Sequence, residues 1–272
     1  MTSPRNFLVM TDYDGTLAEI VRDPAQAYPH SLACPALRAL IGRGHEAYVV
    51  TGRRRDDLLR RLPIDPDRVI GQYGLEWPGG AVSDDLRRQT EQVLSQLPHV
   101  PGVQIEDKGQ CVSVHYRRLP PSQVSGLLEQ LGHLTLPEGW QVRTGKMVME
   151  YWPTGGGKGE VVRQLLQRHP DHLGLFIGDD EADEEAFQAV QAHGGIGVKV
   201  GLAATAAIAR IACVRETIRL LQDLASHLPR EISPLDCEPH RLTGLLWNRR
   251  NLGSSSEADS QGSRGTGSVM PN

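Results

Sequence analysis

The sequence lacks several features that would place it in other classes of protein. Its four cysteines are widely scattered with no Cys-x-x-Cys pair, which favours a reduced cytoplasm with the thiols as small core residues. No apolar run approaches transmembrane length, and the first one, residues 7–10, is far shorter than the centre of a secretory signal. A formal net charge of −4 gives no basic excess for nucleic acid or acidic membranes. We therefore expect a cytoplasmic protein with neither kind of partner.

The composition is that of an ordinary globular protein. Hydrophobic residues make up 39% and charged residues 23% of 272 positions, enough for one large domain or a core with an insertion. The last part differs, because from Gly253 the chain is rich in serine and glycine and cannot offset the entropy of folding. We predict a C-terminal extension at 229–272 that is disordered from about residue 253.

Strands and helices alternate at both ends of the chain. Apolar runs predict strands at 7–11 and 47–51 with a helix at 35–41 between them. Later segments predict helices at 159–167 and 184–190 and strands at 173–177 and 196–200. Such alternation indicates βαβ units, so we expect an α/β fold with a Rossmann-like, doubly wound parallel sheet.

The pattern in the middle of the chain is different. Apolar and polar residues alternate at 103–106 and again at 112–117 around a short glycine turn, which predicts an antiparallel hairpin. A helix at 121–134 and a strand pair at 141–152 follow. We predict an inserted α+β cap at 79–153, with the core made of 1–78 and 154–228.

Acidic residues follow the first predicted strand. Asp12 and Asp14 stand two apart before Gly15, at the carboxyl end of a strand, where open α/β sheets keep their ligands. Two such carboxylates could hold a divalent cation and divide the roles of nucleophile and proton donor. Taken alone, Asp-x-Asp-Gly could equally be a turn that caps a helix.

Two other segments could bind an anion. Thr51 ends the second long strand, so its hydroxyl and the Gly52 amide could contact a phosphate. Lys158 precedes a helix, whose amino terminus favours negative charge. The glycines around Lys158 do not form a P-loop, because Gly159 replaces the required Ser or Thr and Trp152 the first glycine.

A second acidic group follows the strand at 173–177. Asp179, Asp180 and Asp183 lie together there, an arrangement that is costly to bury without a cation. The alternative is an acidic helix start, which the helix dipole favours.

These four segments, in this order, resemble the four motifs of the haloacid dehalogenase superfamily. The resemblance implies that Asp12 is the nucleophile and Asp14 the general acid and base. It also implies that Thr51, Gly52 and Lys158 bind phosphate. The resemblance implies that Asp12, Asp14 and Asp179 are Mg²⁺ ligands. It also implies that Asp180 and Asp183 hold these ligands in place without binding the ion directly.

The sequence further resembles the trehalose-6-phosphate phosphatases over residues 7–224. The shared segments include Glu106-x-Lys108-Gly109, His115-Tyr116-Arg117, Met147-Val148-Met149-Glu150 and Val198-Lys199-Val200-Gly201. The sequence departs from the family in having Thr51 in place of serine and Gln72-Tyr73-Gly74 in place of Asn-His-Gly. The second departure leaves any substrate contact from that loop open.

Polar residues of the cap suit a sugar. Glu106 and Lys108 share one face of a predicted strand, and His115 and Arg117 share a face of its partner. With Arg53 and Glu150 they form the predicted substrate-binding set, although a solvated outer face is the alternative for each residue.

Together these features predict a magnesium-dependent monomeric phosphatase that hydrolyses trehalose 6-phosphate through an aspartyl phosphate, in trehalose biosynthesis. Alternative substrates are the phosphates of glucosylglycerol, mannosylglycerate and sucrose. A phosphosugar mutase and a non-catalytic regulatory domain of the same fold are further alternatives.

Overall fold

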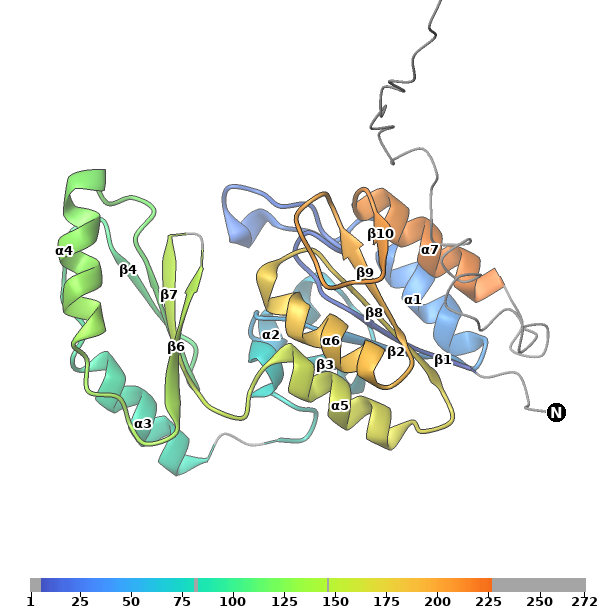
Figure 1. Cartoon of the computed structure of the whole chain (residues 1–272), viewed down its shortest axis with the longest axis horizontal. Helices are drawn as coiled ribbons and strands as arrows, with labels where there is room; N and C mark the ends of the chain where they lie inside the picture. The colour runs from blue at the N-terminus through green and yellow to red at the C-terminus, as the bar shows by residue number, and fades with distance from the viewer. Residues whose placement is uncertain (1–5, 81–82, 146, 227–272) are drawn as a thin grey trace, which may run out of the picture.

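A computed structural model describes residues 6–80, 83–145 and 147–226. Figure 1 shows two separate sheets, one flanked by helices on both faces and the other carrying α3 and α4 at the far end of the molecule. The first sheet is parallel and the second is antiparallel. The predicted fold class, a doubly wound parallel core with an inserted α+β cap, is therefore confirmed.

The parallel sheet has six strands in the order β10-β9-β8-β1-β2-β3. In chain order these are β1 (Phe7–Thr11), β2 (Glu46–Val50), β3 (Val69–Ile70), β8 (Leu173–Gly178), β9 (Ile196–Val200) and β10 (Ala209–Ile211). β1 lies in the middle, between β2 and β8, and all five of its residues are buried. This explains its unbroken apolar run, because a parallel strand covered on both faces has no solvent side.

Alternate residues of β1 enter two different cores. Phe7 and Val9 pack in the cluster that includes side chains of α1 (Ala33–Gly42), α2 (Arg55–Arg61) and α7 (Val214–Ser226). Leu8 and Met10 pack with α5 (Lys158–Arg168) and α6 (Glu184–Ala192) on the opposite face. The central strand is thus fixed from both sides, and its last residue stands immediately before Asp12.

The antiparallel sheet has its own core. Its order is β4-β5-β7-β6, with β4 (Gln104–Asp107), β5 (Val112–His115), β6 (Trp140–Gly145) and β7 (Val148–Pro153). Val112, Val114 and Tyr151 pack against residues of α3 (Asp84–Leu94) and α4 (Pro121–Gly132). Glu106, Ser113 and Glu150 lie side by side across the three strands β4, β5 and β7, so they share one face.

Four short 3-10 helices complete the described elements: η1 (Pro24–Gln26), η2 (Pro66–Arg68), η3 (Gln72–Gly74) and η4 (Glu181–Asp183).

Two details differ from the sequence expectations. β5 ends at His115, so Arg117 lies exposed in the following turn and not on a strand face. Cys111 is buried, but Cys34 is only half-buried and Cys213 is exposed, so not every thiol is a core residue.

The predicted extension at 229–272 and Cys237 lie outside the described residues. Among the helices at 6–80, 83–145 and 147–226, none is long and apolar enough to cross a membrane.

Candidate active site

Three strands deliver the predicted site residues to one edge of the parallel sheet. Asp12 follows β1, Thr51 follows β2, and Asp179 follows β8, and these strands are neighbours in the sheet. Since all three strands are parallel, their carboxyl ends lie together. Lys158, the first residue of α5, reaches the same place from the side.

Lys158 joins two aspartates inside the protein. Its Nζ donates hydrogen bonds to Asp12 Oδ1 at 2.7 Å and to Asp183 Oδ1 at 2.6 Å. All three side chains are almost entirely buried, with 2%, 7% and 0% of their surface exposed. The second oxygen of Asp183 accepts from the backbone amides of Asp179 and Asp180. Both oxygens of Asp183 are therefore engaged, and Asp183 orients Lys158 and the loop that carries Asp179.

Burial crowds negative charge in this site. Desolvation raises the pKa of Asp12, and the nearby Lys158 charge offsets only part of that rise. Desolvation, followed by repulsion from Asp180 and Asp183, raises the pKa of Asp179 to about 7. Carboxylates so placed gain from a cation between them.

Three carboxylates lie close enough together to share such a cation. Asp12, Asp179 and Asp183 offer oxygen atoms that all lie within 4.8 Å of one another. The Asp179 carboxylate lies directly over Gly15, where a Cβ would overlap it. Gly15 also has a φ of +77°, which other residues rarely adopt. An oxygen-rich acidic cluster of this kind fits a hard divalent cation such as Mg²⁺.

Asp14 faces a different partner from Asp12. Arg53 binds both oxygens of the Asp14 carboxylate, and it also donates to Asp57 and to the Pro24 carbonyl. The Asp14 side chain keeps 36% of its surface exposed, whereas Asp12 keeps 7%. The two carboxylates of the motif therefore have different environments, which suits the different roles predicted for them.

The segment after β2, which was predicted to bind an anion, is held in place by its neighbours. The Thr51 hydroxyl is buried and accepts a hydrogen bond from the Arg53 amide at 3.1 Å. The next residue must be glycine, because a Cβ at Gly52 would overlap the Tyr73 ring. Tyr73 in turn donates its amide to the Thr51 carbonyl and accepts from the Gly157 amide. Tyr73 thus connects the Thr51 loop to the loop that carries Lys158.

Gln72-Tyr73-Gly74, where the sequence departs from its relatives, links the two sheets. Gln72 is fully buried, and its Nε2 donates to the Lys108 carbonyl at 2.8 Å, while the Cys111 thiol donates to Gln72 Oε1. Gln72 and Tyr73 have positive φ angles of 47° and 54°. Sequence alone did not reveal this role, since neither residue type signals a left-handed backbone.

The polar face of the antiparallel sheet brings together four of the predicted substrate-binding residues: Glu106, Lys108, His115 and Glu150. Lys108 lies just beyond the end of β4, where a strand position had been predicted, and Arg53 follows β2. Glu150 Oε1 accepts from Lys108 Nζ at 3.1 Å and from Ser113 Oγ at 2.9 Å. Glu106 and His115 are hydrogen-bonded at 2.9 Å. Arg117 is outside this group, so a contact between Arg117 and substrate stays a prediction. Ser113 was not predicted, because a serine in an apolar strand carries no distinguishing signal.

Charged residues of the two sheet domains interact with one another. The hydrogen bond from His115 is the largest cause that lowers the pKa of Glu106, and the charge of Arg53 adds to it. A second link joins Arg143 of β6 to Glu185 of α6, at 3.4 Å. Glu185 also accepts from the Lys158 amide at 3.0 Å. Sequence analysis missed both residues, because they become neighbours only through the fold.

The parallel sheet, the acidic groups at its strand ends and the inserted cap define a capped member of the haloacid dehalogenase superfamily. A family model described as trehalose-phosphatase matches residues 10–212. The chain belongs to the trehalose-phosphatase family.

Two proteins named as trehalose-6-phosphate phosphatases are similar to most of the chain. The trehalose-6-phosphate phosphatase of Escherichia coli is 29% identical over 237 residues, which cover 81% of this chain and 87% of that protein. The C-terminal domain of the Candida albicans trehalose-6-phosphate phosphatase has a solved structure with a TM-score of 0.67 and 25% identity, covering 82% of this chain and 93% of that one. An uncharacterized glycosyl hydrolase of Mycobacterium tuberculosis is 32% identical over 82% of this chain. The chain spans only 18% of that relative's length.

Proposed function

We propose that the chain is a phosphatase that hydrolyses trehalose 6-phosphate to trehalose and phosphate. The observation that carries this proposal is the buried Asp12 carboxylate at the end of β1, with Lys158 Nζ 2.7 Å away. Membership of the trehalose-phosphatase family supports the choice of substrate. The reaction would serve trehalose biosynthesis in the cytoplasm, carried out by a monomer that binds neither nucleic acid nor membrane.

Mg²⁺ is the proposed cofactor. Asp12, Asp179 and the backbone carbonyl of Asp14 would hold it, since both oxygens of Asp183 are already engaged. Asp180 and Asp183 would support that site through the backbone they fix. When bound, Mg²⁺ would screen the repulsion between the carboxylates and the phosphate and stabilise charge in the transition state.

The protein's own groups would divide the remaining chemistry. Asp12 attacks phosphorus and forms an aspartyl phosphate, while Lys158, the Thr51 hydroxyl and the Gly52 amide stabilise charge on the phosphoryl oxygens. Asp14 donates a proton to the departing sugar oxygen and then takes one from the water that cleaves the intermediate. Before this, Asp14 must leave Arg53, which would then be free to contact the substrate.

The cap would recognise the sugar. We propose residues 79–153 as the cap and residues 1–78 with 154–228 as the core. Glu106, Lys108, His115 and Glu150 present carboxylates and cations on one face, which suits a disaccharide of many hydroxyl groups. Arg117 would join them after a movement of its turn.

A panel of phosphate esters tests the proposal. Purified protein with Mg²⁺ is assayed for free phosphate from trehalose 6-phosphate and from the phosphates of sucrose, glucosylglycerol and mannosylglycerate. We expect the highest specificity constant for trehalose 6-phosphate. A higher value for another ester would replace the substrate, an isomerised phosphosugar would indicate a mutase, and no turnover of any ester would indicate a regulatory domain.

A further inference from the structure

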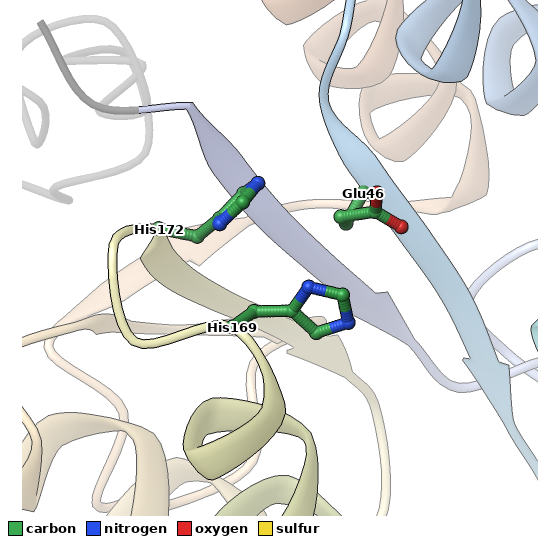
Figure 2. A group of neighbouring side chains, drawn as sticks. All are labelled: Glu46, His169 and His172. Carbon is green, nitrogen blue, oxygen red and sulfur yellow. The ribbon is translucent and has the colours of Figure 1, made fainter.

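A second group of possible metal ligands lies at the edge of the sheet opposite the active site. Glu46 is the first residue of β2, and His169 and His172 lie in the connection between α5 and β8. Asp12 and Asp179 follow the carboxyl ends of their strands, whereas Glu46 stands at the amino end of its strand. Figure 2 shows the three side chains gathered from the two segments.

The three side chains approach one another as ligands would. Each offers one atom, and these atoms all lie within 4.8 Å of one another. All three residues are half-buried, so they are sheltered yet remain reachable from solvent. A tetrahedral zinc ion with bonds of about 2.0–2.1 Å to nitrogen needs ligand atoms about 3.3 Å apart. Side-chain rotations that move the ligand atoms closer by roughly 1 to 1.5 Å would therefore complete the site.

One histidine nitrogen of the group is hydrogen-bonded, and another is buried without a partner. The Nε2 of His169 lies 3.1 Å from the Tyr48 hydroxyl, an interaction that fixes the ring and leaves Nδ1 for a metal. The Nδ1 of His172 is buried and has no hydrogen-bond partner. An unpaired buried nitrogen is costly, and a metal ion would satisfy it. Burial also lowers the pKa of both rings, which keeps them in the neutral form that binds metals.

Arg68 shapes the carboxylate side of the group. It pairs with Glu46 through Oε2, so Oε1 is the oxygen that can face a metal. A carboxylate that is hydrogen-bonded on one oxygen and binds a metal through the other is common. The positive charge of Arg68 repels a bound cation. Metals that form strong bonds to imidazole nitrogen therefore suit this site better than ions held by charge alone.

We propose that Glu46, His169 and His172 bind one zinc-type transition-metal ion, at a site separate from the active site. Two imidazoles and one carboxylate select zinc and its neighbours over Mg²⁺, which prefers oxygen ligands alone. The ion would join β2 to the connection that leads into β8. Because it would bind the folded protein and not the unfolded chain, it would stabilise the fold.

Zinc titration of the full chain tests the site. The protein is stripped with a chelator and titrated calorimetrically with Zn²⁺ in a large excess of Mg²⁺, which competes for the acidic active site. We expect His169→Ala, His172→Ala and Glu46→Ala each to lose one zinc equivalent or at least about tenfold in affinity. His133→Ala, which removes an exposed histidine at the end of α4, should match the wild type.

Melting temperature and X-ray absorption give two independent measurements. Zn²⁺ should raise the melting temperature of the wild type and of His133→Ala, but not that of His169→Ala. If a variant fails to fold, absorption spectra of the zinc-loaded wild type should still show two imidazole ligands. Equal zinc binding in every variant, no binding by the wild type, or a spectrum with oxygen ligands alone would overturn the proposal.

Discussion

The guanidinium of Arg53 holds both carboxylate oxygens of Asp14, with Nε 2.7 Å from Oδ2 and Nη2 2.8 Å from Oδ1. A two-point contact of this kind is stronger and more directional than a single charged hydrogen bond. It keeps the proposed proton carrier in a fixed position before substrate arrives. The proposed mechanism requires this contact to open during each turnover.

Asp14→Asn should separate the two halves of the reaction. With an aryl phosphate, whose leaving group needs little protonation, the first step should continue, but hydrolysis of the aspartyl phosphate should slow about 10²- to 10⁴-fold. Rapid mixing should therefore show a burst of aryl alcohol equal to the enzyme concentration. Arg53→Ala, which keeps the Asp14 carboxylate, should show no burst, and a burst there would contradict the assigned roles.

Asp12→Asn should abolish turnover while the fold persists, because an amide is a poor nucleophile. The measurement is phosphate release under saturating substrate, with circular dichroism to verify folding. Asp84→Asn is the matched control, since Asp84 is exposed in the first turn of α3, away from the parallel sheet. Retention of about a tenth of wild-type turnover by Asp12→Asn would exclude it as the nucleophile.

Without Mg²⁺, stability should fall as pH rises from about 4 to 7. Asp179 has its pKa raised from 3.8 to about 7, so in this range the folded protein holds a proton that the unfolded chain has released. The free energy of unfolding then decreases with increasing pH. Mg²⁺ should raise the melting temperature more at pH 8 than at pH 5. Asp179→Asn should remove most of that difference, and an equal Mg²⁺ effect at both pH values would contradict the assignment.

Changes in the cap should affect only the natural substrate. Glu106→Gln should lower the specificity constant for trehalose 6-phosphate about thirtyfold to a thousandfold (about 2 to 4 kcal/mol), because remote binding also positions the phosphate. Hydrolysis of an aryl phosphate, which lacks the sugar, should hardly change. Glu129→Gln, on the exposed side of α4, serves as the control. Parallel loss of both activities in Glu106→Gln would mean that Glu106 supports the chemistry or the fold.

The sequence predicted best what depends on local pattern. The predicted bounds of β1 and β9 are those observed, because each strand is mainly apolar and is flanked by polar residues or glycine, which leaves little choice of where it begins and ends. The predicted end of a strand was wrong where a polar residue could continue the alternation. Arg117, for example, lies beyond the end of β5. A pattern of alternating residues does not say where hydrogen bonding between strands stops.

Contacts between distant segments could not be predicted in the same way. Gln72 meets the Lys108 carbonyl and Arg143 meets Glu185 only after the two sheets have formed and packed. Glu46, His169 and His172 are likewise drawn together by the pairing of β8 with β1 and of β1 with β2. The sequence indicated where Asp12 and Asp179 would lie, because each directly follows a predicted strand of the parallel sheet. It did not indicate which side chains of the two sheets would contact one another.

The central place of β1 has a consequence for synthesis on the ribosome. Its neighbours β2 and β8 are far apart in the sequence, and the whole antiparallel sheet is encoded between them. As the chain emerges, β1 can pair with β2 early, but its other edge stays open until residues 173–177 have been made. An open apolar strand edge invites pairing with other chains. The strand that precedes Asp12 therefore needs protection until β8 has been made, and β8 then supplies both the missing neighbour and the loop that carries Asp179.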